Sequence, residues 1–151
     1  RFKPKPTTVF EDLNAVEDIR IKGILVDEVT MPTNDGTRGS ALYKIPFELN
    51  RRPDYEWINL FVSAWNHPPS YTLMHRPGIA SVYGNKIVLD GTEIEEVEKY
   101  HKATLKLAVE IANKTYKEIQ SRKKQKEDEE NRRREEHKRN IEEASKRINF
   151  D

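Results

Sequence analysis

The feature that most constrains the fold is a helical pattern that begins near Gly91 and continues without interruption to the end of the printed sequence. No glycine or proline follows Gly91, and these two residues are the least favourable ones inside a helix. Thr92 and Glu95 have the spacing of a capping box, in which both side chains bond free backbone N–H groups at a helix start. The sequence therefore predicts one long helix beginning at Thr92.

The first part of this helix has an apolar face. Apolar or small residues recur every three or four positions, at Ile94, Val97, His101, Leu105, Ala108, Ala112, Thr115 and Ile119. This spacing places them on one side of a helix, where they can cover a sheet. His101 belongs to the stripe, and we expect it to be a hydrogen-bonded core or rim histidine rather than a ligand.

Beyond Ile119 the pattern changes to a charged arm. Residues 121–140 contain no apolar side chain, and acid-to-base pairs four residues apart, such as Glu130 and Arg134, favour an exposed helix. We expect the arm to be helical over most of 121–148 and to project from the domain. Apolar residues return at its tip, where Ile141, Ala144 and Ile148 have helical spacing, and we expect these to contact a partner.

Length and composition predict one globular domain with two extensions. Of the 151 residues, we assign 1–17 to an irregular leader, 18–120 to the globular domain and 121–151 to the arm. The sequence does not establish whether the chain is part of a longer protein. It has no cysteine, which excludes disulfides and cysteine-based zinc sites. We expect neither a metal nor a cofactor.

Two segments before residue 50 have strand character. Residues 19–29 are rich in β-branched side chains, which predicts a strand that is interior for part of its length, with Gly23 at a bulge. Residues 41–49 alternate around Pro46. Because proline cannot donate a ladder hydrogen bond, this pattern predicts an edge strand.

A helix is predicted from Pro53 to about Asn66. Proline is favoured in a first helical turn, and Trp57, Phe61 and Trp65 follow at intervals of four. An aromatic face with this spacing is more often core than a binding surface.

The segments that follow predict strands. Residues 71–75 can form a short one, and residues 79–83 and 86–89 flank Gly84 and Asn85 as in a tight hairpin. Together with the two helices, this order predicts an α+β fold with a small antiparallel sheet of about four to five strands packed by both helices, the C-terminal one long.

Motifs for nucleotide binding, zinc proteolysis and serine hydrolysis are missing from the sequence. An enzyme would therefore need a less obvious site. His75 on a loop, with Asp27 and Glu28 at a strand end, could supply a general acid and base for a hydrolase, provided that they lie close together. This is one alternative function.

Nucleic-acid binding is the other alternative. Arg51 and Arg52 precede the N-terminus of a predicted helix, which offers backbone donors to an anion, and Arg76 could lie nearby. The formal net charge of +1 is small for a protein that would bind through phosphate neutralisation.

The preferred interpretation is a non-catalytic interaction domain that binds a partner protein or a second copy of itself. It rests on the charged arm, because no motif indicates a catalytic pocket. With no apolar run long enough to span a membrane and no signal peptide in the printed sequence, we expect a soluble cytoplasmic protein without a membrane partner.

Overall fold

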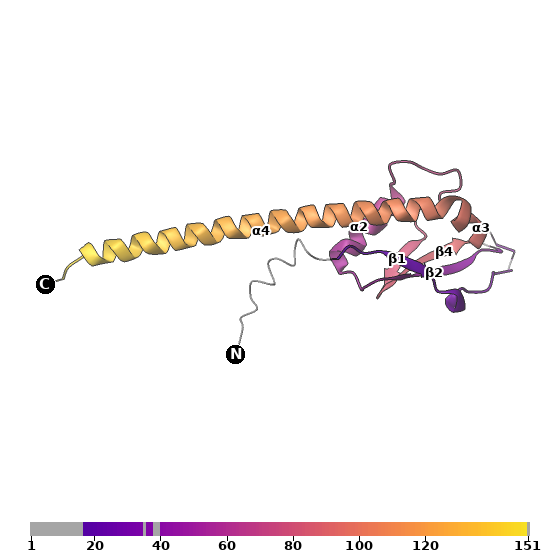
Figure 1. The fold of residues 1–151 in the computed structure, drawn as a ribbon, viewed down its shortest axis with the longest axis horizontal. Coiled ribbons are helices and arrows are strands. Elements are labelled where there is room, and N and C mark those ends of the chain that lie inside the picture. Colours follow the sequence, from indigo (N-terminus) through magenta and orange to yellow (C-terminus); the bar gives the residue numbers. More distant parts are fainter. Residues whose placement is uncertain (1–16, 35, 38–39, 151) are drawn as a thin grey trace. The chain divides into compact units, whose positions relative to one another are not determined.

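The computed structural model describes residues 17–34, 36–37 and 40–150, and Figure 1 shows its fold. Contacts divide the chain into two units, Val16–Tyr116 and a second unit whose described part is 117–150. Of the predicted leader, 1–17, only Glu17 lies within the described residues.

Unit Val16–Tyr116 contains a four-stranded antiparallel sheet with strand order β1-β2-β4-β3. The elements in chain order are β1 (Ile21–Ile24), the 3₁₀ turn η1 (Val26–Glu28), β2 (Tyr43–Leu49), α2 (Tyr55–Asn66), β3 (Ala80–Tyr83), β4 (Lys86–Thr92), α3 (Ile94–Glu96), the π-helical turn η2 (Val97–His101) and α4, which runs from Lys102 to Arg147 and so crosses into the second unit. The predicted α+β class, with two main helices of which the C-terminal one is long, is confirmed.

The core lies between one face of the sheet and two helices (Figure 1). Alternation along β2 and β4 directs Ile45, Phe47 and Leu89 to the same face, where they are buried. From α2 and α4, the buried apolar side chains are Trp57, Phe61, Ala64, Trp65, Leu105, Ala108, Val109 and Ala112. Burial of each large apolar side chain contributes roughly 1.5 to 3 kcal/mol, so this cluster is the main source of stability.

The side-chain amide of Asn113 joins three segments. Its Oδ1 accepts hydrogen bonds from the backbone N–H of Ile19 at 3.1 Å and from Trp57 Nε1 at 2.8 Å, and its Nδ2 donates to the Ile19 carbonyl at 3.0 Å. One residue of α4 therefore fixes both the segment leading into β1 and the first turn of α2.

The outer face of the sheet is covered by opposite charges. Ion pairs join Lys22 to Glu48 at 3.9 Å, Lys44 to Asp90 at 3.9 Å and Lys86 to Glu28 at 2.7 Å. Exposed pairs of this kind each contribute about 0 to 1 kcal/mol. Their main effect is that this face is locally neutral.

The prediction that residues 41–49 form an edge strand is wrong, because β2 lies between β1 and β4. Pro46 is tolerated there because β1 ends at Ile24, which is paired with Phe47. Beyond that point, on the β1 side, the Pro46 carbonyl accepts from Leu25 N at 3.0 Å. Pro46 has no N–H to donate, but at its position the β1 ladder has already ended, so no ladder hydrogen bond is lost.

The first predicted strand is shorter than expected and lies at an edge. The apolar run of 19–29 becomes the four-residue strand β1 followed by the 3₁₀ turn η1. The predicted bulge is confirmed by a register shift between Ile21 and Gly23.

The predicted helix and hairpin are confirmed, but α2 begins two residues later than expected, so Pro53 precedes the N-cap and is not in the first turn. Asp54 is the N-cap of α2, and its carboxylate accepts from Trp57 N at 3.0 Å. Strands β3 and β4 are joined at Gly84 and Asn85, with φ of +61° at Gly84. A positive φ at the first central residue is typical of a type II′ turn.

Two local predictions are wrong: the strand at 71–75 and the capping box at Thr92. Residues 71–75 form no strand, because this segment is held by turns and side-chain bonds instead of a ladder.

Thr92 ends β4 and Glu93 is the N-cap of α3 without a side-chain cap bond. The Thr92 hydroxyl is used inside the protein, where it donates to Glu96 Oε1 at 2.7 Å, so no capping box forms.

In the second unit, the described residues continue α4 to Arg147 and are almost all exposed. Intrahelical pairs four residues apart join Lys124 to Asp128 at 3.3 Å and Arg134 to Glu130 at 3.5 Å. Helicity over most of the predicted arm is confirmed. Among the described residues, no helix combines the length and the apolar character that a membrane span requires.

We expect a chain ending at Gln120 to fold cooperatively, because the last fully buried apolar residue of α4 is Ala112 and residues 121–143 are exposed apart from Lys124. Its free energy of unfolding should stay within about 1 kcal/mol of that of the full chain. Thermal and urea unfolding of both chains, followed by circular dichroism, measure this. A broad, non-cooperative transition for the shorter chain would show that the arm contributes to the core.

Candidate functional site

Two histidines pack against the same tryptophan at the C-terminal end of α2. The Trp65 ring lies 4.9 Å from the His75 ring and 5.5 Å from the His101 ring, measured between centroids. Tyr71 packs edge-on against His75 at 5.2 Å. His75 and Tyr71 come from the loop between α2 and β3, and His101 ends the π-helical turn η2. The fold thus gathers three separate segments here.

The carboxylate of Glu96 connects this cluster to the loop. Arg76 Nε donates to its Oε1 at 2.8 Å and Arg76 Nη2 to its Oε2 at 2.6 Å, in a two-point pairing. Thr92 Oγ1 also donates to Oε1, and Trp65 Nε1 donates to the Arg76 carbonyl at 2.9 Å. Charge-assisted two-point bonds fix orientation as well as distance, so the loop is anchored through Arg76.

These contacts determine the charge states of Glu96 and Arg76. Hydrogen bonds from Arg76, and then from Thr92, lower the pKa of Glu96 from 4.5 to about 2, although burial opposes the shift. Hydrogen bonding to Glu96 raises the pKa of Arg76 above its usual 12.5. Glu96 is therefore a carboxylate and Arg76 a cation at any pH near neutrality.

The ring nitrogens of the two histidines are buried and form no hydrogen bond of ordinary geometry to a described residue. His101 is completely buried, and neither of its ring nitrogens has a hydrogen-bond partner among the described residues; the same holds for the buried ring nitrogens of His75. His101 Nε2 lies 3.4 Å from Glu96 Oε1. Burial is the main cause that lowers the pKa of each histidine below 6.5. The expectation of a core position for His101 holds, but the expected hydrogen bond does not form.

This arrangement stabilises structure better than it could perform acid–base chemistry. A general base must reach the proton that it removes, whereas the ring nitrogens of both histidines are covered. Among the residues that the structure describes, no group of three or more histidine and acidic side chains could hold a metal ion.

The predicted hydrolase residues are not brought together. Asp27 and Glu28 lie in η1, and Glu28 bonds Lys86 Nζ at 2.7 Å at the start of β4. His75 belongs to the cluster around Glu96, which bonds Thr92 at the other end of the same strand. A seven-residue strand separates these ends by about 20 Å.

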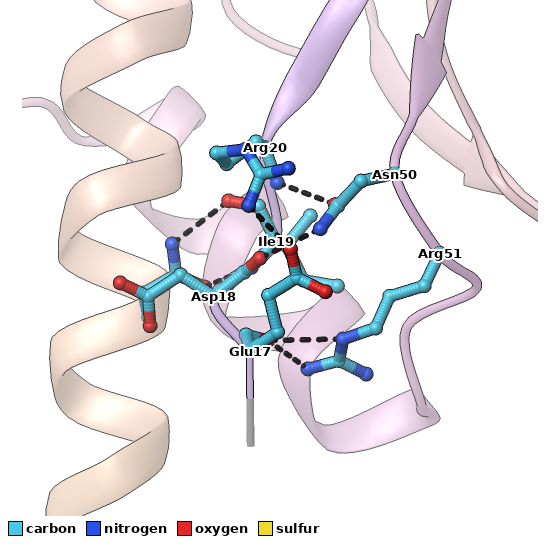
Figure 2. A network of polar contacts seen from close by, with 7 residues as sticks. Glu17, Asp18, Ile19, Arg20, Asn50 and Arg51 are labelled. Atoms are coloured by element: carbon cyan, nitrogen blue, oxygen red, sulfur yellow. Dashed lines mark hydrogen bonds and ion pairs between the residues drawn. The ribbon is translucent and has the colours of Figure 1, made fainter. Parts of the chain in front are cut away.

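The predicted anion-binding arginines are also separated. Figure 2 shows the Arg51 guanidinium directed at the Glu17 carbonyl, to which Nε and Nη2 donate at 3.0 and 2.7 Å. The backbone donors at the start of α2 face the Asp54 carboxylate, which disfavours a bound anion. Arg76 lies at the opposite end of α2, paired with Glu96. Arg52, next to Arg51, is exposed.

Sequence reasoning missed the residue on which this cluster depends, Glu96. The π-helical turn brings Glu96 and His101, five positions apart, within 3.4 Å, and a regular helical period does not place such residues together. It also missed the exposure of the loop, where Leu73 is 86% exposed. Its apolar character predicted a strand instead.

The predicted tip residues form an exposed apolar stripe on the arm. Ile141 is 55% and Ile148 59% exposed, with Ala144 partly exposed between them. Ile148 follows the last residue of α4, and its N–H still donates to the Ser145 carbonyl at 3.3 Å. We refer to Ile141, Ala144 and Ile148 as the tip stripe.

Comparison of the chain with models of protein families, with curated proteins and with solved structures found no match. The site must therefore be interpreted from its own geometry.

Acidification should destabilise the protein in two separate steps. The pKa values of His75 and His101 are lowered in the folded state, so the stability they contribute is complete above pH 6.5 and is lost as pH falls toward their folded values. Glu96, with its pKa lowered from 4.5 to about 2, contributes about 3 kcal/mol that is lost between those values.

Urea unfolding from pH 8 to pH 2 measures these steps. His101→Phe should reduce the first step, and His137→Gln on the exposed arm should leave the profile unchanged. A first step of equal size in the wild type and His101→Phe would contradict the role of His101.

Replacing Glu96 by glutamine should destabilise the protein by roughly 1.5 to 3 kcal/mol, because hydrogen bonds to charged groups are worth about this much. Arg76 would lose its two-point partner, and the loop between α2 and β3 would lose its anchor. Chemical denaturation at pH 7 measures the loss, with Glu98→Gln, an exposed change on the same helical segment, as the control. Equal effects of the two changes would show that the pairing has no structural importance.

Proposed function

We propose that this chain is a non-catalytic interaction protein that binds an apolar groove on a partner protein through the tip stripe. The observation that supports the proposal is that Ile141, in the last turns of α4, and Ile148, directly after its last residue, are more than half exposed beside charged and polar side chains. Apolar side chains on an otherwise polar surface mark an interaction site when they lie together in one patch.

The spacing of the stripe fits one recognition mode. Ile141, Ala144 and Ile148 occupy positions i, i+3 and i+7. Helices that bind in apolar grooves use anchors at these positions. A groove also offers more apolar surface to each anchor than a single facing helix would.

The small size of the stripe favours a partner over a second copy. A dimer through two tips would bury two isoleucines from each copy, each worth at most about 1.5 to 3 kcal/mol. Association costs about 4 to 15 kcal/mol, which offsets most of this gain. Before the stripe, the same helical face has Glu130 and Arg134, so a longer seam would place charges in its core.

Site-specific photocrosslinking in the cells that make the protein tests the proposal. A photoreactive residue at Ser145, beside the stripe, should give one discrete protein adduct, whereas the same residue at Lys146, about 100° further around the helix, should give little. Adding Ile141→Asp should remove the Ser145 adduct, because a charge cannot be buried in an apolar groove without a large cost.

Asn140→Asp adds the same charge one residue away and should leave the adduct in place. Light scattering on the purified chain should show a monomer at micromolar concentration. An adduct of equal strength from both faces, or one that survives Ile141→Asp, would contradict binding through the stripe. A stable dimer that Ile141→Asp dissociates would replace the partner by a second copy.

A further inference from the structure

The charged side chains that flank the tip stripe are positive. On a helix with about 100° per residue, Arg134, Lys138 and Arg133 lie within roughly 20°, 60° and 80° of Ile141. All three side chains are exposed. Arg134, 72% exposed, has Glu130 3.5 Å away as its intrahelical partner, and its guanidinium has further donors.

The carboxylates of the same stretch lie on the other side. Between positions 133 and 148 the acidic residues are Glu135, Glu136, Glu142 and Glu143. Each lies about 100° or more from Ile141 around the helix axis. From position 133 onward the apolar stripe is therefore flanked by cations and the carboxylates lie away from it, although the whole chain has a formal net charge of only +1. One turn earlier, Glu130 shares the face of the stripe and pairs with Arg134, which leaves Lys138 and Arg133 as the flanking cations that form no ion pair among the described residues.

We infer that the partner groove is rimmed by carboxylates. This inference rests on the proposed function and specifies its partner. Complementary rim charges steer encounter and select partners more than they add affinity, which suits a stripe with few apolar anchors. A basic rim would face like charge and would be rejected.

A protein groove fits this helix better than an anionic membrane surface. Interfacial helices bury a broad face that contains Trp, Phe or Leu, whereas the tip stripe is narrow, with two isoleucines and one alanine, and the exposed Phe150 lies beyond the end of α4. Three anchors in line fit a narrow groove.

Two synthetic helical hairpins of three heptads per helix test the inference on the full chain. In both, leucines line an exposed apolar groove between the two helices; the acidic probe has glutamate and the basic probe lysine along the rims of that groove. Fluorescence anisotropy should show at least tenfold tighter binding of the acidic probe in 50 mM NaCl, and the difference should shrink in 500 mM NaCl because salt screens exposed charges.

Arg134→Glu with Lys138→Glu should abolish the preference for the acidic probe. Arg139→Glu with Lys146→Glu changes the net charge by the same amount in the same stretch, but about 160° and 140° from Ile141, and should preserve it.

The outcomes separate the two proposals. Equal binding of both probes that is lost on Ile141→Asp would overturn the acidic rim and keep groove binding by the stripe. If Ile141→Asp does not weaken binding of the acidic probe, the contact is made by charge alone and the proposed function is overturned. Failure of both probes to bind would overturn both. Binding to vesicles of anionic lipid, lost with Arg134→Glu and Lys138→Glu while neither probe shows a preference, would assign the basic flanks to a membrane surface instead.

Discussion

The side-chain amide of Asn113 forms three hydrogen bonds, and the arrangement of the globular unit depends on these bonds. Its partners are the backbone of Ile19 and the indole of Trp57, so α4, α2 and the segment before β1 share one polar contact at the edge of an apolar core. Such a contact specifies a single relative position, which apolar packing alone does not. At the other end of α2, Glu96 does the same for the loop through Arg76.

The fold could be predicted where local periodicity and burial agree. Trp57, Phe61 and Trp65 at intervals of four are all buried, and Gly84 with Asn85 forms the turn of a hairpin. The errors occur where tertiary structure decides. Proline predicts an edge strand, but Pro46 is accommodated in an inner strand because the neighbouring strand β1 ends beside it. Thr92 reads as a cap, but its hydroxyl bonds a buried carboxylate.

The site was less predictable than the fold, because its partners are distant in sequence. His75 and Arg76 stand out as polar residues on a loop, yet nothing local indicates that their neighbours are Trp65 and Glu96. A π-helical turn shifts the phase of the helix by one residue, and this shift brings His101 beside Glu96. The tip stripe is different, since a return of apolar residues after twenty polar ones is visible in the sequence itself.

The exposure of the arm has a consequence for the lifetime of the chain. Residues 121–143 present lysine and arginine on almost every turn and, apart from Lys124, are exposed. Helical backbone without tertiary packing opens locally at little cost, and open, basic segments are preferred substrates of trypsin-like proteases. A partner seated on the tip would slow this opening, so bound chains would survive while free ones are trimmed. Under the proposed function, the abundance of the intact protein would then follow that of the protein bound at the tip.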